Sequence, residues 1–345
     1  MSLPSGTFQE SYAQDMAIFR TRTQWILLLV FLALVFTIPL YAPNEILTLL
    51  TLIGITIIGV LGLNILTGCC GQLSLGHAGF MAVGGYSLAI LSAKLGWPFW
   101  AALPAAGLIS GIIGILFGLP SLKIKGFYLI MATVAAYFII IWLILQLRGL
   151  TGGTDGLSVP QAAFGGLIIK GKAAYFYLVI GIACLATYLA KNIIRTRAGR
   201  AFIAIRDNDL AAEVMGVNLW VYKLQAFFIG CVFAGVAGGL SVQYYSFANV
   251  EQFPFINSIW YLGMLIVGGM GSTSGVIFGV VSIKLLDQFA TKVGPLLANI
   301  VNPQAAVGLS LILTGMVIIL FLIFEPRGIA HLWERIKTYY RLWPF

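Results

Sequence analysis

The sequence predicts an all-α fold: a polytopic integral membrane protein with about ten transmembrane helices and broken or re-entrant glycine-rich segments. Of its 345 residues, 60% are hydrophobic and only 9% are charged, whereas about a quarter of a soluble domain is charged. The 48 residues between Glu45 and Lys94 include no Asp, Glu, Lys or Arg, which is enough for two helices of about 20 residues with a segment between them. Such long, continuous apolar segments exclude barrel strands, because lipid-exposed backbone is satisfied only within helices or closed barrels.

Ten apolar segments, separated by Pro and Gly clusters, form the predicted transmembrane domain, residues 25–324. They cover residues 25–42, 46–67, 78–93, 99–120, 126–147, 173–190, 224–246, 255–270, 275–291 and 304–324. A polar N-terminal tail, 1–24, precedes them with no clear small-residue cleavage site, so no cleavable signal peptide is expected. In the C-terminal tail, 325–345, apolar residues recur at helical spacing from Ile329 to Trp343 among basic residues. This pattern predicts an amphipathic helix lying on the inner leaflet, with membrane lipid as its partner.

The basic residues indicate the orientation of the chain. A net charge of +9 would suggest nucleic acid as a partner of a soluble protein, but basic residues near the ends of spans usually set membrane topology instead. With the N-terminus in the cytoplasm, 14 of the 20 Lys and Arg residues fall on the cytoplasmic side. An even number of spans then places both termini in the cytoplasm, and no nucleic-acid partner is expected.

The first unusual stretch, Thr67–Gly79, lies between the second and third spans and holds four glycines but no charge. Irregular backbone at membrane depth persists only where protein or a water-filled cavity surrounds it, so we expect a broken or re-entrant segment beside a translocation pathway. The alternative is a tight turn between packed helices. The candidate pathway residues are Gln72, Ser74, Gly76, His77 and Gly79. A lone histidine of this kind is more often a hydrogen-bonded structural group than a proton carrier.

A second glycine-rich stretch, Gly268–Gly275, lies within 32 uncharged residues from Gln252 to Ile283. That run is long for one membrane pass and short for two. Paired glycine-interrupted segments in the two halves of a transporter often mark the translocation site, but a tight turn joining two packed helices explains this stretch equally well.

The third stretch is the loop 191–223, which carries six basic and three acidic residues. Asp209 is expected to cap a short helix from Leu210 to Met215, and Gly216 to end it. Glu213 lies within this predicted helix. A short helix presented on the inner surface suggests a docking element; the alternative is an ordinary connecting loop that orients the protein by its charge.

An external loop is predicted between the fifth and sixth spans. Glycine-dense turns and an acidic residue suit a rigid loop there, for contact with another protein or for structure alone. Its candidate residues are Thr151, Gly152, Gly153 and Asp155.

Features that an enzyme requires are not found in the sequence. Residues Gly166–Ala173 nearly match the phosphate-binding loop, but Ala173 lacks the hydroxyl group that would hold Mg²⁺. No catalytic residue, metal site or cofactor is predicted for this chain. The four cysteines lie inside apolar segments, at Cys69, Cys70, Cys184 and Cys231. They suggest neither a zinc site nor a disulfide framework.

The charges within the spans are nearly confined to Lys284 and Asp287. They are three residues apart and share a helix face, so we favour an ion pair near the outer interface over contact with a solute. Ion-coupled transporters usually contain several intramembrane carboxylates, which indicates that the energy for this chain comes from elsewhere.

Five motifs resemble those of a known family. In order along the chain they are Gly71–Phe80, Leu150–Leu157, Arg197–Asn218, Ala226–Gly239 and Gly268–Ser272. Through them, residues 46–328 resemble the LivM-type permease subunits of high-affinity branched-chain amino acid ABC importers. The resemblance implies a bacterial-type cytoplasmic (inner) membrane, a LivH-type second permease, two cytoplasmic ATP-binding subunits that hold ATP and Mg²⁺, and a periplasmic or lipid-anchored solute-binding protein.

The resemblance also implies that the 191–223 loop couples ATP hydrolysis to transport. The importer signature E-A-A-x-x-x-G is retained at Ala211–Gly216 as A-A-x-x-x-G, with Leu210 where Glu is expected. The candidate coupling residues are Arg200, Arg206, Asp207, Asp209, Ala211, Ala212, Glu213 and Gly216.

Two other functions stay open. A similar permease could carry urea, short-chain amides or other small organic acids. A stand-alone secondary transporter would instead work without any ATPase and would tolerate deletion of 200–216.

Overall fold

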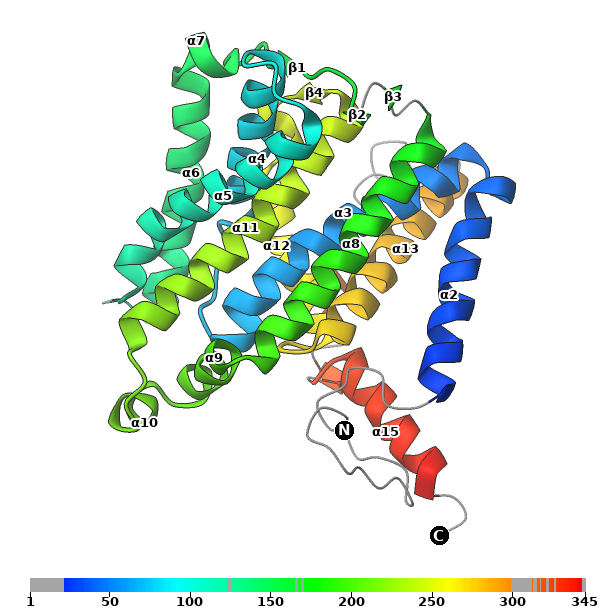
Figure 1. The fold of residues 1–345 in the computed structure, drawn as a ribbon. Helices are drawn as coiled ribbons and strands as arrows, with labels where there is room; N and C mark the ends of the chain where they lie inside the picture. The colour runs from blue at the N-terminus through cyan, green and yellow to red at the C-terminus, as the bar shows by residue number, and fades with distance from the viewer. Residues whose placement is uncertain are drawn as a thin grey trace.

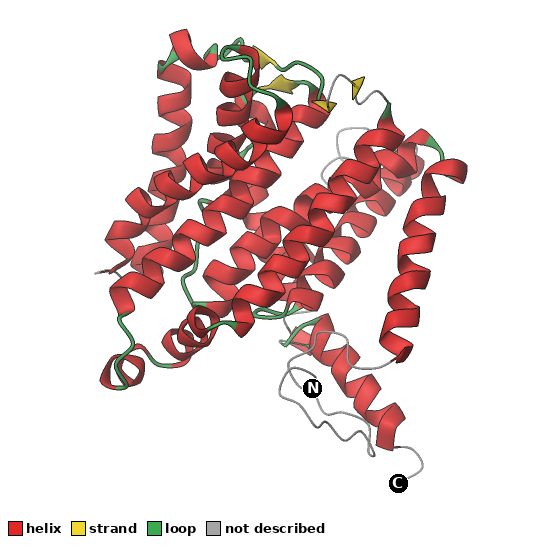
Figure 2. Cartoon of the chain, viewed as in Figure 1, coloured by secondary structure: helices red, strands yellow, loops and turns green. Residues whose placement is uncertain are grey.

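The computed structural model describes residues 22–122, 124, 126–164, 167–168 and 171–298, and beyond them residues 312, 315–316, 318–320, 323–325 and 327–342. These residues form a bundle of long tilted helices (Figure 1). Helix dominates the bundle, and short strands occur only at one of its ends (Figure 2). The predicted all-α membrane class is therefore confirmed.

The elements follow one another along the chain. The helices are α2 (Arg22–Tyr41), α3 (Asn44–Leu63), the π-helix η1 (Asn64–Cys69), α4 (His77–Ala93), α5 (Phe99–Gly118), the 3₁₀-helix η2 (Leu119–Leu122), α6 (Phe127–Gln146), α7 (Arg148–Thr151), α8 (Lys172–Arg195), α9 (Arg197–Asp207), α10 (Asp209–Val214), α11 (Leu219–Tyr245), the 3₁₀-helix η3 (Val250–Gln252), α12 (Phe255–Gly268), α13 (Thr273–Ala298) and α15 (Ile329–Leu342). Two antiparallel strand pairs join β1 (Leu157–Ser158) to β4 (Phe247–Ala248) and β2 (Ala163–Phe164) to β3 (Leu167–Ile168).

Nine of the ten predicted spans coincide with a helix, and the tenth, 304–324, falls largely outside the described residues. Within the described part, six helices are long and apolar enough to cross a membrane by length and composition. They are Asn44–Cys69, Phe99–Gly118, Phe127–Gln146, Lys172–Arg195, Leu219–Tyr245 and Thr273–Lys292. With 17 and 14 residues, α4 and α12 are shorter than the roughly 20 residues that a full crossing needs.

Close packing around α11 holds the bundle together, because α11 contacts α3, α4 and α5. Small residues allow these backbones to approach one another. A Cβ atom on Gly84 of α4 would collide with the backbone of Gly235 of α11, and one on Gly238 would collide with the carbonyl of Met81. Glycine at these positions is therefore a packing requirement.

The chain between α3 and α4 is broken, as the sequence predicts. After η1 the backbone leaves the helix, and α4 begins at His77, whose Nε2 lies 2.7 Å from the carbonyl oxygen of Gly59 on α3. Gly59 precedes Cys69, the end of η1, by ten residues, or about 15 Å of helix. The irregular segment thus runs back along α3, and α4 starts deep inside the bundle.

The first turn of α4 meets the first turns of α12 inside the bundle. The backbone N–H of Ala78 donates to Ser258 Oγ at 2.9 Å, and the Tyr137 hydroxyl of α6 donates to the carbonyl of Phe253 at 2.9 Å. Two short helices therefore begin in the interior rather than at a membrane surface.

The second glycine-rich stretch forms a turn between α12 and α13. Gly269 and Gly271 have φ angles of +111° and +82°, which other residues rarely adopt. A Cβ atom on Gly268 would collide with the carbonyl of Gly275, so the two helices are in close contact. Of the two interpretations drawn from the sequence, the structure has the tight turn between packed helices.

Candidate functional site

Two short helices, α9 and α10, lie at the end of the bundle opposite β1 and β4 (Figure 1). The hydroxyl of Thr196 accepts the N–H of Gly199 at 3.3 Å and caps α9. One side of α9 is buried against the bundle, through Ala201, Phe202 and Ile205. Helix α9 was not predicted, although a threonine followed by apolar residues at helical spacing indicates such a helix.

A different residue from the predicted one caps α10. Asn208 Oδ1 accepts the N–H of Ala211 at 3.1 Å, so the assignment of the cap to Asp209 is wrong. Asp209 instead forms an ion pair with Lys223 at the start of α11, at 2.9 Å between Oδ2 and Nζ. Gly216 follows the helix with φ +85°, which explains why α10 ends there.

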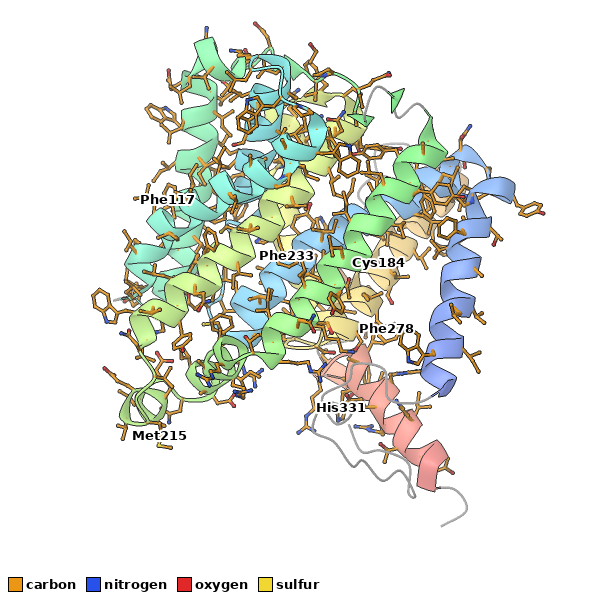
Figure 3. The ribbon with its side chains drawn as sticks, in the orientation of Figure 1. Phe117, Cys184, Met215, Phe233, Phe278 and His331 are labelled. Atoms are coloured by element: carbon orange, nitrogen blue, oxygen red, sulfur yellow. The ribbon has the colours of Figure 1, made fainter. Side chains whose placement is uncertain are left out.

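The outward face of α10 is apolar. Leu210, Val214 and Met215 are 70%, 87% and 83% exposed, and Met215 lies at the lower left of the molecule in Figure 3. Ala212, by contrast, is buried, whereas Ala211 and Glu213 are exposed. An apolar cluster projecting from so short a helix favours contact with another protein.

Arg206, in the last turn of α9, reaches the break in the membrane helices. Its Nη1 donates to the carbonyl of Gly68 in η1 at 3.2 Å, while Nε and Nη2 lie 3.0 and 2.9 Å from Asp207 Oδ1. A Cβ atom on Gly71 would lie 3.2 Å from the Cα atom of Arg206. The backbone of the broken segment therefore rests directly on α9.

The α12–α13 turn joins the same contact. Asn64 Oδ1 in η1 accepts the N–H of Gly271 at 2.8 Å, and a Cβ atom on Gly271 would lie 3.0 Å from Arg206 Nη1. We call Asn64, Gly68, Arg206 and Gly271 the clasp. It connects α9 with both glycine-rich stretches at one point.

The remaining charged coupling candidate on α9 has a local role. Arg200 is exposed, and its Nη1 donates to the carbonyl of Arg195 at 3.3 Å. The structure thus separates Arg206, which contacts the break, from Arg200, which supports the end of α8.

The predicted pathway residues lie inside this chain. Gln72, Ser74 and His77 are 4%, 0% and 0% exposed. A Cβ atom on Gly76 would collide with the carbonyl of Thr133, and one on Gly79 would lie 3.2 Å from the Cα atom of Tyr137. The bond from His77 to Gly59 fits the structural role favoured for this histidine. That these residues line a pathway stays a prediction.

A cavity of about 230 Å³ lies beside the clasp. Its polar lining includes Gln72, Arg206, Asp209 and Lys223, and Ile124, Leu129 and Ile205 supply apolar walls. It therefore joins one predicted pathway residue to two predicted coupling residues. Within the described part of the chain, no group of three or more His, Cys, Asp or Glu could hold a metal ion.

The predicted outer loop is joined to the end of α6 by hydrogen bonds of Thr151. Thr151 is buried, and its hydroxyl donates to the carbonyl of Ile144 at 2.6 Å and accepts the N–H of Gly153 at 3.2 Å. Gly152 and Gly153 have φ angles of +75° and +57°, while Asp155 is exposed. The loop then leads into the β1–β4 pair.

The sequence model of a family described as "Branched-chain amino acid transport system / permease component" matches residues 45–322. This chain belongs to that permease family. It is 31% identical over 337 residues to the high-affinity branched-chain amino acid transport system permease protein LivM of Escherichia coli K12, covering 90% of this chain and 75% of the relative. The Salmonella typhimurium LivM is 30% identical over the same shares.

A probable LivM of Methanocaldococcus jannaschii is 27% identical, covering 66% of this chain and 67% of that one. The family resemblance drawn from the sequence is confirmed. The chain is a multi-pass membrane permease, a transport subunit of the ABC transporter class.

Proposed function

We propose that this chain is the membrane-spanning permease subunit of an ATP-driven importer and that its cargo is a branched-chain amino acid. Its family and the named function of its LivM relatives support the cargo. The clasp carries the proposed coupling mechanism, because it is a direct contact between the surface helices and the broken membrane helices.

In this mechanism a partner ATPase binds the exposed apolar face of α10. The Asp209–Lys223 ion pair fixes α10 to α11, and Arg206 connects α9 to η1. Movement of the α9–α10 unit when the ATPases close would displace the carbonyl of Gly68 and, through Asn64, the α12–α13 turn. Single-turn π-helical segments occur frequently at functional sites, and η1 would be the element that changes.

The proposed assembly rests on these surfaces and on the family of the chain. The α9–α10 end faces the cytoplasm, where two ATP-binding subunits supply ATP and Mg²⁺, and both termini lie on that side. The β1–β4 end faces outward, where a solute-binding protein docks near Thr151–Asp155. A LivH-type second permease completes the complex, and the solute passes between the two permeases. Gln72, Ser74 and His77, whose side chains are buried within this chain, would shape that path by holding the broken segment in place.

Purification of a tagged chain from its native membrane tests the assembly, and reconstitution of the complex in vesicles tests the transport. A second permease and ATPases should co-purify, and labelled leucine should enter only when ATP and the binding protein are present. Uptake by the purified chain alone, without ATP, would establish a secondary transporter instead. Uptake of urea in preference to leucine would overturn the cargo.

Arg206→Ala tests the coupling. Losing its contact with Gly68 should leave ATP hydrolysis running while lowering leucine transported per ATP about tenfold, because the mechanical link is lost while the docking face remains. Arg197→Ala, which removes an exposed charge from the first turn of the same helix, is the matched control. Equal transport per ATP in both variants would refute the clasp as a coupling contact.

A further inference from the structure

One face of α13 is polar along its second half. Lys284, Asp287, Gln288 and Thr291 recur at positions i, i+3, i+4 and i+7, the spacing that places residues along one side of a helix. We call these four residues the α13 stripe. It lies in a segment that is otherwise apolar enough to cross a membrane, Thr273–Lys292.

The charged members of the stripe lie within the membrane span. α13 runs from Thr273 to Ala298, which puts Lys284 about 16 Å from its N-terminal end and about 21 Å from its C-terminal end. Asp287 is about 21 Å and about 16 Å from the same ends. Since the hydrocarbon core is about 30 Å thick, Lys284 sits near its middle.

Within the part of the chain that the structure describes, no group within 4 Å neutralises these charges. Ile283 and Ala290, on the buried side of α13, are 2% and 3% exposed, whereas Asp287 is exposed and Lys284 half-buried. Among the described residues, neither the Lys284 ammonium nor the Asp287 carboxylate has a hydrogen bond or an ion pair within 4 Å. The ion pair favoured from the sequence is therefore not formed.

Lipid is an unsuitable neighbour for the stripe. A charged side chain at this depth is costly in hydrocarbon and usually faces a bundle interior or a water-filled cavity. Lysine can extend its stem toward the interface, but aspartate is too short to do so. The apolar face beside the stripe, with Leu285 and Phe289 50% and 68% exposed, is the face suited to hydrocarbon.

We infer that the α13 stripe lines the translocation path and contacts the two charged groups of an α-amino acid. This inference rests on the proposed import function and adds the residues that contact the cargo. Lys284 would meet the carboxylate and Asp287 the ammonium group, one helical turn apart. Gln288 and Thr291 continue the polar line toward the C-terminal end of α13, which is the outer end under the proposed orientation. A solute with a single charge would leave one of the two side chains unmatched.

The first test measures uptake by the complete importer at saturating, leucine-loaded binding protein. Lys284→Gln and Asp287→Asn should each lower leucine uptake about tenfold, the effect of removing one charged hydrogen bond. The exchange variant Lys284→Asp/Asp287→Lys should recover part of the lost leucine uptake, because both charges remain on the stripe. Leu285→Ala, on the adjacent apolar face, should transport like the wild type.

The second test asks whether water reaches the stripe. Asp287→Cys and Gln288→Cys, placed in a background in which the exposed Cys184 is replaced by Ser, should react with a membrane-impermeant thiol reagent added outside. Loaded binding protein together with ATP should slow that reaction. Leu285→Cys should react slowly in both conditions, because it faces lipid.

The outcomes separate this inference from the proposed function. Wild-type uptake in both charge-neutralised variants, or unreactive cysteines on the stripe, would overturn the inference. Loss of the second permease from the purified complex of either variant would also overturn it, because the stripe would then be a subunit contact. If the wild-type importer itself fails to transport leucine, the proposed cargo fails, while the thiol reaction still reports whether the stripe lines a water-filled path.

Discussion

The ion pair between Asp209 and Lys223 yields an asymmetric prediction for the stability of α10. The Lys223 side chain is 7% exposed and the Asp209 side chain 21% exposed. Asp209→Ala leaves an ammonium group that is almost completely enclosed, whereas Lys223→Met leaves a carboxylate that can turn toward water and keeps the apolar stem of residue 223. The aspartate variant should therefore be the more damaging.

The expected cost of Asp209→Ala is about 2–3 kcal/mol, between the costs of breaking an exposed and a fully buried ion pair. For Lys223→Met we expect about 1 kcal/mol, because the remaining charge is hydrated. Since 1.36 kcal/mol corresponds to a factor of ten, local opening of α10 should increase about 30- to 150-fold in the first variant and about fivefold in the second.

Hydrogen exchange of the 209–216 amides in the purified importer measures this opening. Glu213→Ala removes an exposed carboxylate from the same helix and serves as the control, with exchange close to that of the wild type. If Asp209→Ala and Lys223→Met accelerate exchange equally, or if neither exceeds the control, the ion pair does not hold α10 in place.

Two further predictions concern a helix cap and a packing contact. Asn208→Ala should accelerate exchange of the Ala211 amide about fivefold, because the lost cap is worth about 1 kcal/mol, and Asn208→Ser should restore protection; equal exchange in the alanine and serine variants would contradict the cap. Gly84→Val should lower the yield of folded chain several-fold, because its side chain would overlap the Gly235 backbone, whereas Gly181→Ala, at an exposed position of α8 where a Cβ atom meets nothing within 4 Å, should retain most of the yield. Size-exclusion chromatography in detergent measures both, and a normal yield for Gly84→Val would refute the close contact.

Several features could be predicted because they depend on local sequence. Residues 46–93 contain no charge, which predicts membrane spans, and four glycines cluster in Thr67–Gly79, which predicts the break between them. Both predictions follow from how backbone and side chains partition into lipid. The end of α10 just before Gly216 was predictable for the same reason, since a left-handed backbone favours glycine wherever the helix packs.

The details of the site depend on contacts between distant segments. Asn208 and Asp209 are both good capping residues, and the choice between them follows from Lys223, which lies in the next helix and takes the carboxylate of Asp209. Likewise, i, i+3 spacing permits an ion pair between Lys284 and Asp287 but does not require one. In the folded chain Lys284 is half-buried and Asp287 exposed, and no hydrogen bond or ion pair within 4 Å joins the two side chains.

By itself the sequence determined that this chain enters a membrane, where most of its helices lie, where they break, and which family it resembles. Hydrophobicity and backbone preferences act over a few residues, and so their effects can be predicted from the local sequence. Only the tertiary structure decided that α9, η1 and the α12–α13 turn meet, because Asn64 and Gly271 are separated by 207 residues. Such a contact depends on how whole helices pack, which no local pattern specifies.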